Sequence, residues 1–100
     1  MPSTIGNEGL FEVISASSDC EKLQSGDWVI PNITAWGTWR SHAVENEDHF
    51  IKLPSNNKLT KEACSTIAVN PVTAYRMLND FIQLKPNDTI IQNGANSSVG

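Results

Sequence analysis

The chain has 100 residues, a net charge of −4 and an apolar content of 39%, a composition typical of an ordinary globular protein. The negative charge argues against a nucleic acid or an anionic membrane surface as the main partner. No apolar run approaches the ~20 residues that a membrane-spanning helix needs, and the first five residues carry no targeting signal. Cys20 and Cys64 form no Cys-x-x-Cys or Cys/His spacing, so we expect two reduced thiols and no metal site.

The first half of the chain predicts four short strands. Each is a short run rich in β-branched or aromatic residues, bounded by glycine, proline or polar turn residues. The runs are residues 10–14, 28–30, 38–44 and 49–54. Such strands, separated by polar connections and an acidic turn at residues 45–48, indicate part of a β-rich, barrel-like domain.

The second half predicts two helices. Thr60 is placed to cap a helix over residues 61–68. A second helix follows, with Asn70 as its N-cap and Pro71 as its first helical residue. Its apolar residues recur at three- and four-residue spacing and predict a buried stripe. The stripe consists of Val72, Tyr75, Met77, Leu78, Phe81 and Ile82.

The chain closes on a turn at residues 85–88, a short strand predicted at residues 89–92, and a small-residue loop at residues 93–100. A buried strand that feeds such a loop is typical of dinucleotide-binding folds, where the amides of the loop contact the pyrophosphate. Against the pattern Gly-x-Gly-x-x-Gly, Ala95 and Ser97 replace the first two glycines and Gly100 matches the third. An ordinary strand followed by a polar turn remains the alternative.

Four motifs in order resemble the mitochondrial trans-2-enoyl thioester reductases, a zinc-free branch of the medium-chain dehydrogenases/reductases. The motifs are residues 26–31, 37–40, 70–78 and 92–100. Residues 6–9, Gly-Asn-Glu-Gly, also resemble the Gly-His-Glu turn of zinc alcohol dehydrogenases, with Asn7 in place of the zinc-binding histidine. Asparagine is a poor zinc ligand, so no metal is expected.

The resemblance implies an α/β fold in which part of a GroES-like β-barrel, residues 1–68, precedes the first elements of a Rossmann domain, residues 69–100. It implies that NADPH and the substrate bind in the cleft between the two domains. The implied activity is NADPH-dependent reduction of trans-2-enoyl thioesters of acyl carrier protein or CoA in mitochondrial fatty acid synthesis. The resemblance also implies a homodimer and a mitochondrial location.

Five residues take cofactor-binding roles from the resemblance. Asn70 would contact the cofactor in the cleft, and Asn96, Ser97, Ser98 and Val99 would surround its phosphates, although Ser98 stands where many relatives have glycine. No catalytic residue is expected within the chain, because the family's tyrosine proton donor falls outside the matched region. The 100-residue chain alone is therefore expected to be inactive.

Two other functions stay open. One is a zinc-free quinone oxidoreductase, which would share the fold and the cofactor but act on another acceptor. The second is a non-catalytic, truncated isoform that acts as an interaction module; it requires a chain that folds stably by itself.

Several conspicuous residues are expected to be structural. Trp28, Trp39 and Tyr75 are expected to pack in the interior, whereas Trp36 lies in a loop where a substrate role is an alternative to packing.

The polar residues of the same half are also expected to have no catalytic or ligand-binding role. His42 and His49 are expected to face solvent without a partner, and Arg40 to stack, to pair or to keep a strand edge soluble. The acidic residues Glu45, Glu47 and Asp48 are expected to form a solvated turn.

Overall fold

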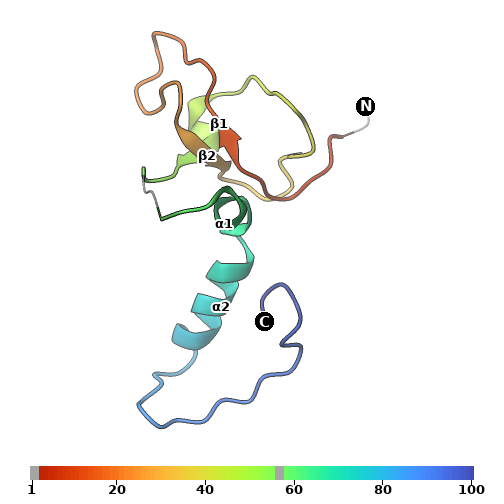
Figure 1. The fold of residues 1–100 in the computed structure, drawn as a ribbon, viewed down its shortest axis with the longest axis vertical. Coiled ribbons are helices and arrows are strands. Elements are labelled where there is room, and N and C mark those ends of the chain that lie inside the picture. Colours follow the sequence, from red (N-terminus) through yellow and green to blue (C-terminus); the bar gives the residue numbers. More distant parts are fainter. Residues whose placement is uncertain (1–2, 56–57) are drawn as a thin grey trace. The chain divides into compact units, whose positions relative to one another are not determined.

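The computed structural model describes residues 3–55 and 58–100, which divide into two compact units, Met1–Thr66 and Ile67–Gly100 (Figure 1). The first unit contains a small antiparallel sheet, a short 3-10 helix and one α-helix. The second contains one α-helix followed by an extended segment. The described residues thus form an α/β arrangement. The elements are β1 (Phe11–Glu12), β2 (Trp28–Pro31), η1 (Glu47–His49), β3 (Phe50–Lys52), α1 (Lys61–Thr66) and α2 (Asn70–Asn79).

The sheet has the order β1-β2-β3, with both pairs antiparallel. Val29 in the central strand pairs with Phe11 on one side and with Lys52 on the other. Val29 and Ile30 are buried, because a central strand has neighbours along both edges and β-branched side chains pack well on a pleated surface. Three of the four predicted strands are therefore confirmed, each shorter than or close to its predicted length.

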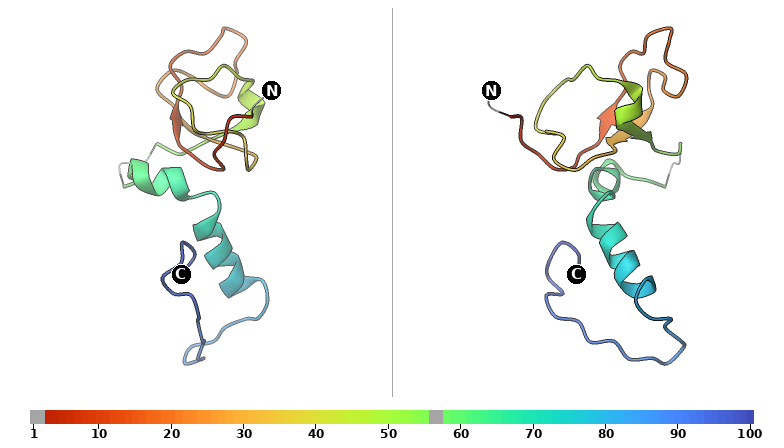
Figure 2. Two further views of the ribbon diagram at one scale, coloured as in Figure 1. Left: turned by 90° about the vertical axis from the view of Figure 1, so that its right-hand side faces the viewer. Right: turned by 180° about the vertical axis from the view of Figure 1, so that it is seen from behind.

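A fifteen-residue excursion, residues 13–27, joins β1 to β2 and is closed at its base by hydrogen bonds. The Val13 amide donates to the Asp27 carbonyl at 2.9 Å, and the Gly26 amide donates to the Val13 carbonyl at 2.8 Å. Gly26 has φ of +90°, a conformation that favours glycine. The excursion is the orange loop that leaves the sheet in Figures 1 and 2.

The strand predicted at residues 38–44 is wrong. The Trp39 amide donates to the Ile5 carbonyl at 2.9 Å, so this residue pairs with the N-terminal segment rather than with the sheet. The next amide, that of Arg40, turns back to the Thr38 carbonyl at 2.8 Å. The amides of Trp39 and Arg40 are thus used outside the sheet, one by the N-terminal segment and one within the turn. Beyond the turn, Val44 is fully exposed.

Helix α1 confirms its predicted start. The Thr60 hydroxyl accepts a hydrogen bond from the Ala63 amide at 3.2 Å, which satisfies one free amide of the first turn. The helix ends at Thr66, two residues before the predicted end. Cys64 lies on its inner side and is completely buried; Cys64 and Cys20 are both free thiols.

Helix α2 begins one residue earlier than predicted, so Asn70 is its first residue and not its N-cap. Val69 occupies the cap position and makes no side-chain capping bond; its carbonyl accepts the Thr73 amide at 2.9 Å. Pro71 lies in the first turn as predicted, where its missing N–H costs nothing. The helix ends at Asn79, so Phe81 and Ile82 lie beyond it.

The buried stripe predicted for this helix is wrong. Tyr75 is 67% exposed, and the other members of the stripe, Val72, Met77, Leu78, Phe81 and Ile82, are exposed as well. The apolar spacing is present, but no second element packs against this face among residues 67–100.

The strand predicted at residues 89–92 is also absent. Ile91 is almost fully exposed, and residues 89–92 have no strand partner among the described residues. A strand exists only as part of a ladder, so the β-rich sequence alone does not produce one. The turn before it is confirmed: the Asp88 amide donates to the Lys85 carbonyl at 3.0 Å. None of the helices described is long and apolar enough to cross a bilayer.

Candidate functional site: the closing loop and the aromatic cluster

The closing loop forms a hydrogen-bonded turn. Gly94 has φ of +62°, and its carbonyl accepts a hydrogen bond from the Ser97 amide at 2.9 Å. The Ser97 hydroxyl oxygen then accepts the Gly100 amide at 3.2 Å. Both bonds are local, so the sequence from Gly94 to Gly100 is sufficient to curl the chain.

Position 100 requires glycine, because the backbone of Gly94 and Ala95 lies close to it. A Cβ atom at Gly100 would lie 2.6 Å from the carbonyl carbon of Ala95 and 2.6 Å from the carbonyl oxygen of Gly94. Backbone atoms cannot move aside as a flexible side chain can. The third glycine of the sequence pattern thus has a physical reason, and the two substituted positions, Ala95 and Ser97, are accommodated.

The loop has the properties that a phosphate ligand needs. The amides of Asn96, Ser98 and Val99 make no hydrogen bond to any described residue, while the amides of Ser97 and Gly100 hold the turn. The Ser97 hydroxyl accepts one bond and keeps its own proton to donate. Unpaired amides and hydroxyls along a tight turn form an anion-binding concavity.

The structure brings four of the five predicted cofactor-binding residues together on this loop. Asn70 stands apart from them in the chain, half-buried at the start of α2. Among the residues described, no hydrogen bond joins Asn70 to the loop.

In the first unit, three aromatic rings from separate segments form a cluster. The Trp36 ring meets the Phe11 ring edge-on at a centroid distance of 5.4 Å and the Phe50 ring at 5.3 Å. Such edge-to-face contacts are favourable beyond the area that they bury. Trp36 is therefore a packing residue, and the substrate role of its loop stays a prediction. Trp39, by contrast, is 73% exposed, so the expected interior role of Trp39 is wrong.

Arg40 stacks on Trp36, one of the three rings of this cluster. Its guanidinium carbon lies 4.4 Å from the centre of the Trp36 ring, and its Nε donates to the Gly37 carbonyl at 2.6 Å. The stacking expected as one option is thus confirmed, and its partner is Trp36. Sequence reasoning could have found this pair, since the two residues are four apart around a glycine turn.

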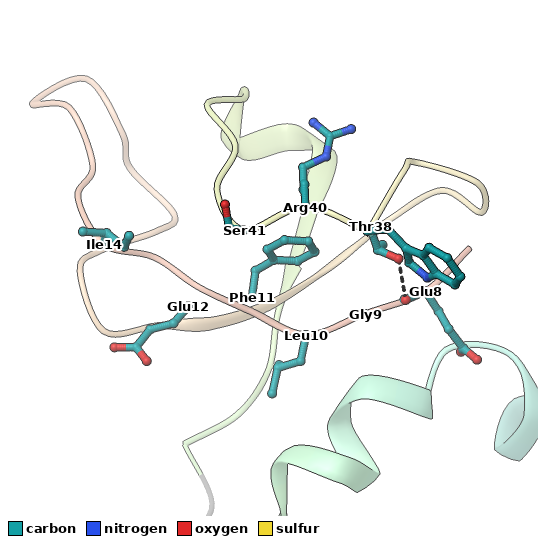
Figure 3. Close-up of a pocket in the computed structure, with 10 residues that line it drawn as sticks. Glu8, Gly9, Leu10, Phe11, Glu12, Ile14, Thr38, Arg40 and Ser41 are labelled. Carbon is teal, nitrogen blue, oxygen red and sulfur yellow. Dashed lines mark hydrogen bonds between the residues drawn. The ribbon is translucent and has the colours of Figure 1, made fainter. Parts of the chain in front are cut away.

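Two cavities border the cluster. One, of about 540 Å³, lies between residues 8–14 and the turn at residues 38–41 (Figure 3). The second, of about 590 Å³, lies between the β1–β2 excursion and residues 41–47 and is lined mainly by apolar side chains, Val13 and Leu23 among them. Both belong to the first unit.

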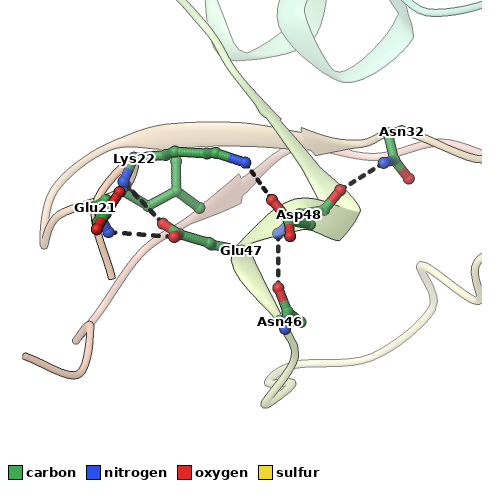
Figure 4. Close-up of polar contacts among 7 residues, drawn as sticks. Glu21, Lys22, Asn32, Asn46, Glu47 and Asp48 are labelled. Carbon is green, nitrogen blue, oxygen red and sulfur yellow. Dashed lines mark hydrogen bonds and ion pairs between the residues drawn. The ribbon is translucent and has the colours of Figure 1, made fainter. Parts of the chain in front are cut away.

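The acidic turn is largely exposed to solvent, as expected, but Glu47 and Asp48 also have partners that were not expected (Figure 4). The Glu47 carboxylate accepts the amides of Glu21, Lys22 and Leu23 at 3.1, 2.9 and 3.2 Å. Asp48 forms an ion pair with the Lys22 ammonium. Together the two side chains attach the β1–β2 excursion to η1.

These contacts shift the pKa values of the groups involved. Hydrogen bonds from the amides of Lys22 and Glu21 lower the pKa of Glu47, and the Lys22 ammonium lowers the pKa of Asp48. The carboxylate of Asp48 in turn raises the pKa of Lys22. A second ion pair joins Lys52 in β3 to Asp27, which immediately precedes β2, with 2.7 Å between the Lys52 Nζ and a carboxylate oxygen of Asp27. The Lys52 ammonium lowers the pKa of Asp27.

His49 has a partner, contrary to expectation. Its Nδ1 lies 3.2 Å from a carboxylate oxygen of Glu45, although both side chains remain accessible to solvent. His42 is exposed. Across residues 3–55 and 58–100, no group of three or more His, Cys, Asp or Glu side chains is arranged to hold a metal ion.

Comparison with known proteins identifies relatives over the whole chain. No protein-family model matches it. The mitochondrial enoyl-[acyl-carrier-protein] reductase of Homo sapiens is 48% identical over 100 residues, which is all of this chain and 26% of the relative. The chain is homologous to the mitochondrial enoyl-[acyl-carrier-protein] reductases. It spans about a quarter of the length of the curated relatives that it matches.

Solved structures agree with this homology. The Etr1p/Etr2p heterodimer of mitochondrial 2-enoyl thioester reductase from Candida tropicalis matches 95% of this chain and 29% of that one, at 50% identity and a TM-score of 0.88. An Etr1p/NADP/crotonyl-CoA complex matches 81% of this chain and 25% of that one, at 50% identity and a TM-score of 0.76.

Proposed function

We propose that the chain is part of an NADPH-dependent reductase of trans-2-enoyl thioesters. The observation that carries this proposal is the 48% identity over the whole chain to an enoyl-[acyl-carrier-protein] reductase. The match to a reductase solved with NADP and crotonyl-CoA supports both the cofactor and the thioester substrate. Because the relatives named are mitochondrial proteins, we place this reductase in mitochondria, with fatty acid synthesis as its pathway.

The proposal includes the architecture of the whole enzyme. Residues 1–68 would form part of a GroES-like barrel, and residues 69–100 would begin a Rossmann domain. The antiparallel sheet of the first unit suits a barrel. The unpartnered stripe of α2 and the exposed Ile90 and Ile91 suit a helix and a strand that pack against further elements. A pairing of two reductase chains in a solved relative supports a two-subunit assembly, here a homodimer.

Within this enzyme, the closing loop would hold the phosphates of NADPH. The amides of Asn96, Ser98 and Val99 are unpaired among the described residues, and the Ser97 hydroxyl can donate. Asn70 would contact the cofactor from the start of α2. The bound cofactor supplies the hydride that reaches the β-carbon of the enoyl thioester. The closing loop would bind the diphosphate and thereby position the cofactor. The proton donor is expected outside this chain, because the family's tyrosine falls outside the matched region and the chain's one tyrosine, Tyr75, lies on the apolar stripe of α2.

The test is an assay of the whole reductase that contains this chain. Crotonyl-CoA and NADPH are mixed with the purified protein, and the loss of absorbance from the reduced cofactor is followed. We expect turnover with crotonyl-CoA and little with a quinone acceptor. Turnover with the quinone alone would replace this proposal with a quinone oxidoreductase, and no turnover with either acceptor would reject a reductase altogether.

A further inference from the structure

Arg40 is held in one orientation by three contacts. Its guanidinium stacks on Trp36 at 4.4 Å, its Nε donates to the Gly37 carbonyl at 2.6 Å, and its Nη2 donates to the Trp36 carbonyl at 3.3 Å. Trp36 is itself fixed by two phenylalanine rings. The side chain is nevertheless exposed. An arginine that is rigid before binding loses less entropy when a ligand arrives.

Arg40 also keeps its charge uncompensated. Three other cations are paired with carboxylates: Lys22 with Asp48, Lys52 with Asp27 and Arg76 with Asp80. Lys61 and Lys85, like Arg40, form no ion pair with a described residue, but neither is fixed by hydrogen bonds as Arg40 is. No carboxylate of a described residue lies within 4 Å of the Arg40 guanidinium. Of its five N–H groups, two are used by backbone carbonyls, so three remain for a ligand.

The guanidinium of Arg40 is open to solvent, and in Figure 3 it projects from residues 38–41 to the side away from residues 8–14. Arg40 lines the cavity of about 540 Å³ between residues 8–14 and 38–41. Two carboxylates, those of Glu8 and Glu12, line the same cavity, but in Figure 3 both point away from the side to which Arg40 projects. One oxygen of Glu8 is buried without a hydrogen-bond partner among the described residues.

We propose that Arg40 binds a phosphate ester of the substrate's carrier group. This inference rests on the proposed function, in which the acyl group arrives on CoA or on the phosphopantetheine arm of a carrier protein. A polyanionic carrier is attracted by a local cation that has no carboxylate beside it. A planar guanidinium with parallel free N–H groups matches two phosphate oxygens. Under the proposed function, the cofactor's phosphates are assigned to the closing loop, so the carrier group of the substrate is the remaining phosphate ligand.

The experiment compares two substrates in the whole reductase. Crotonyl-CoA carries phosphates, whereas the crotonyl thioester of N-acetylcysteamine has the same reacting group and none. For Arg40→Gln we expect the KM for crotonyl-CoA to rise about tenfold, as the loss of a charged hydrogen bond predicts. The KM for the phosphate-free thioester and the KM for NADPH should stay unchanged. Arg40→Lys keeps the positive charge but lacks the parallel N–H groups of the guanidinium. It should give a smaller rise in the KM for crotonyl-CoA.

Arg76→Gln is the matched control, because Arg76 is an exposed arginine already paired with Asp80. It should leave all three KM values unchanged. The inference is overturned if Arg40→Gln or Arg40→Lys raises the KM of both thioesters equally, which is the mark of a merely structural role. A rise confined to NADPH also overturns it. An unmodified enzyme that reduces neither thioester would instead reject the proposed function.

Discussion

The carboxylate of Glu47 fixes the long connection between β1 and β2 in the first unit. Glu47 accepts three consecutive amides of the β1–β2 excursion, from Glu21 to Leu23, and so replaces the hydrogen bonds that a strand would supply. A charged acceptor makes stronger hydrogen bonds than a neutral one. Sequence reasoning placed Glu47 in a solvated turn, because its partners lie about 25 residues away and no spacing rule joins them. Long-range polar contacts of this kind carry no periodic signal.

The Glu47 contacts should give the excursion a pH dependence. The pKa of Glu47 is lowered from its ordinary value of 4.5, chiefly by the amides of Lys22 and Glu21. The contribution of a group with a lowered pKa is present above the unfolded-state pKa and is lost as the pH falls through the folded-state pKa. We therefore expect the amides of residues 21–23 to stay protected from hydrogen exchange at pH 7 and to lose protection below about pH 4.5.

Glu47→Gln in the whole protein tests this dependence. Protection factors of residues 21–23 should fall at pH 7 and should no longer change on acidification, since the titrating group is gone. Glu62→Gln, which makes the same charge change on α1, should leave them as they were. Equal protection in Glu47→Gln and the unmodified protein at pH 7 would contradict the prediction.

At the scale of elements, the sequence predicted what local chemistry determines. The cap of α1 by Thr60 and the turn at residues 85–88 are confirmed, since each is made by neighbours along the chain. The strand at 89–92 is wrong because its formation depends on partners elsewhere. The strand at 38–44 is wrong because Trp39 and Arg40 use their amides in other pairings. Local signals thus predicted the start of α1 and the turn, whereas the start of α2 was one residue off. The strands depended on their pairing partners.

The closing loop is the element where a prediction about the cofactor belongs. Gly100→Ala places a methyl group 2.6 Å from the backbone of Gly94 and Ala95, so the turn must open. Opening displaces the amides of Ser98 and Val99 from their positions. In the whole reductase we expect the dissociation constant for NADPH to rise between about tenfold and a hundredfold, because a misplacement of about 1 Å in a positioned site can cost up to about a hundredfold. Fluorescence titration with NADPH measures it.

Gln83→Ala is a suitable control for this variant, because Gln83 is exposed and lies outside the loop. It should bind NADPH as the unmodified protein does. Unchanged cofactor affinity in Gly100→Ala would mean that the loop does not hold the phosphates, and the four residues from Asn96 to Val99 would lose their assignment.

For the whole molecule, the distribution of apolar side chains decides whether the chain can fold alone. Val29, Ile30 and Cys64 form the buried hydrophobic core among the described residues, whereas large side chains such as Trp39, Tyr75 and Phe81 are exposed. Burial of apolar area is the main favourable term in folding, at about 25 cal/mol per Å². Side chains that water still reaches contribute little of it, while the backbone entropy must be lost in full.

The isolated 100-residue chain should therefore lack a stable tertiary structure. We expect a broad, non-cooperative thermal transition by circular dichroism, binding of a hydrophobic dye such as ANS at pH 7, and no reduction of crotonyl-CoA. The whole reductase in the same buffer, with a sharp transition and no dye binding, is the comparison. A single sharp transition of the isolated chain would contradict this prediction and would favour the alternative of an independently folded interaction module. In that event the exposed stripe of α2 would bind a partner protein. It would not be a face that further elements of a nucleotide-binding domain cover in the whole protein.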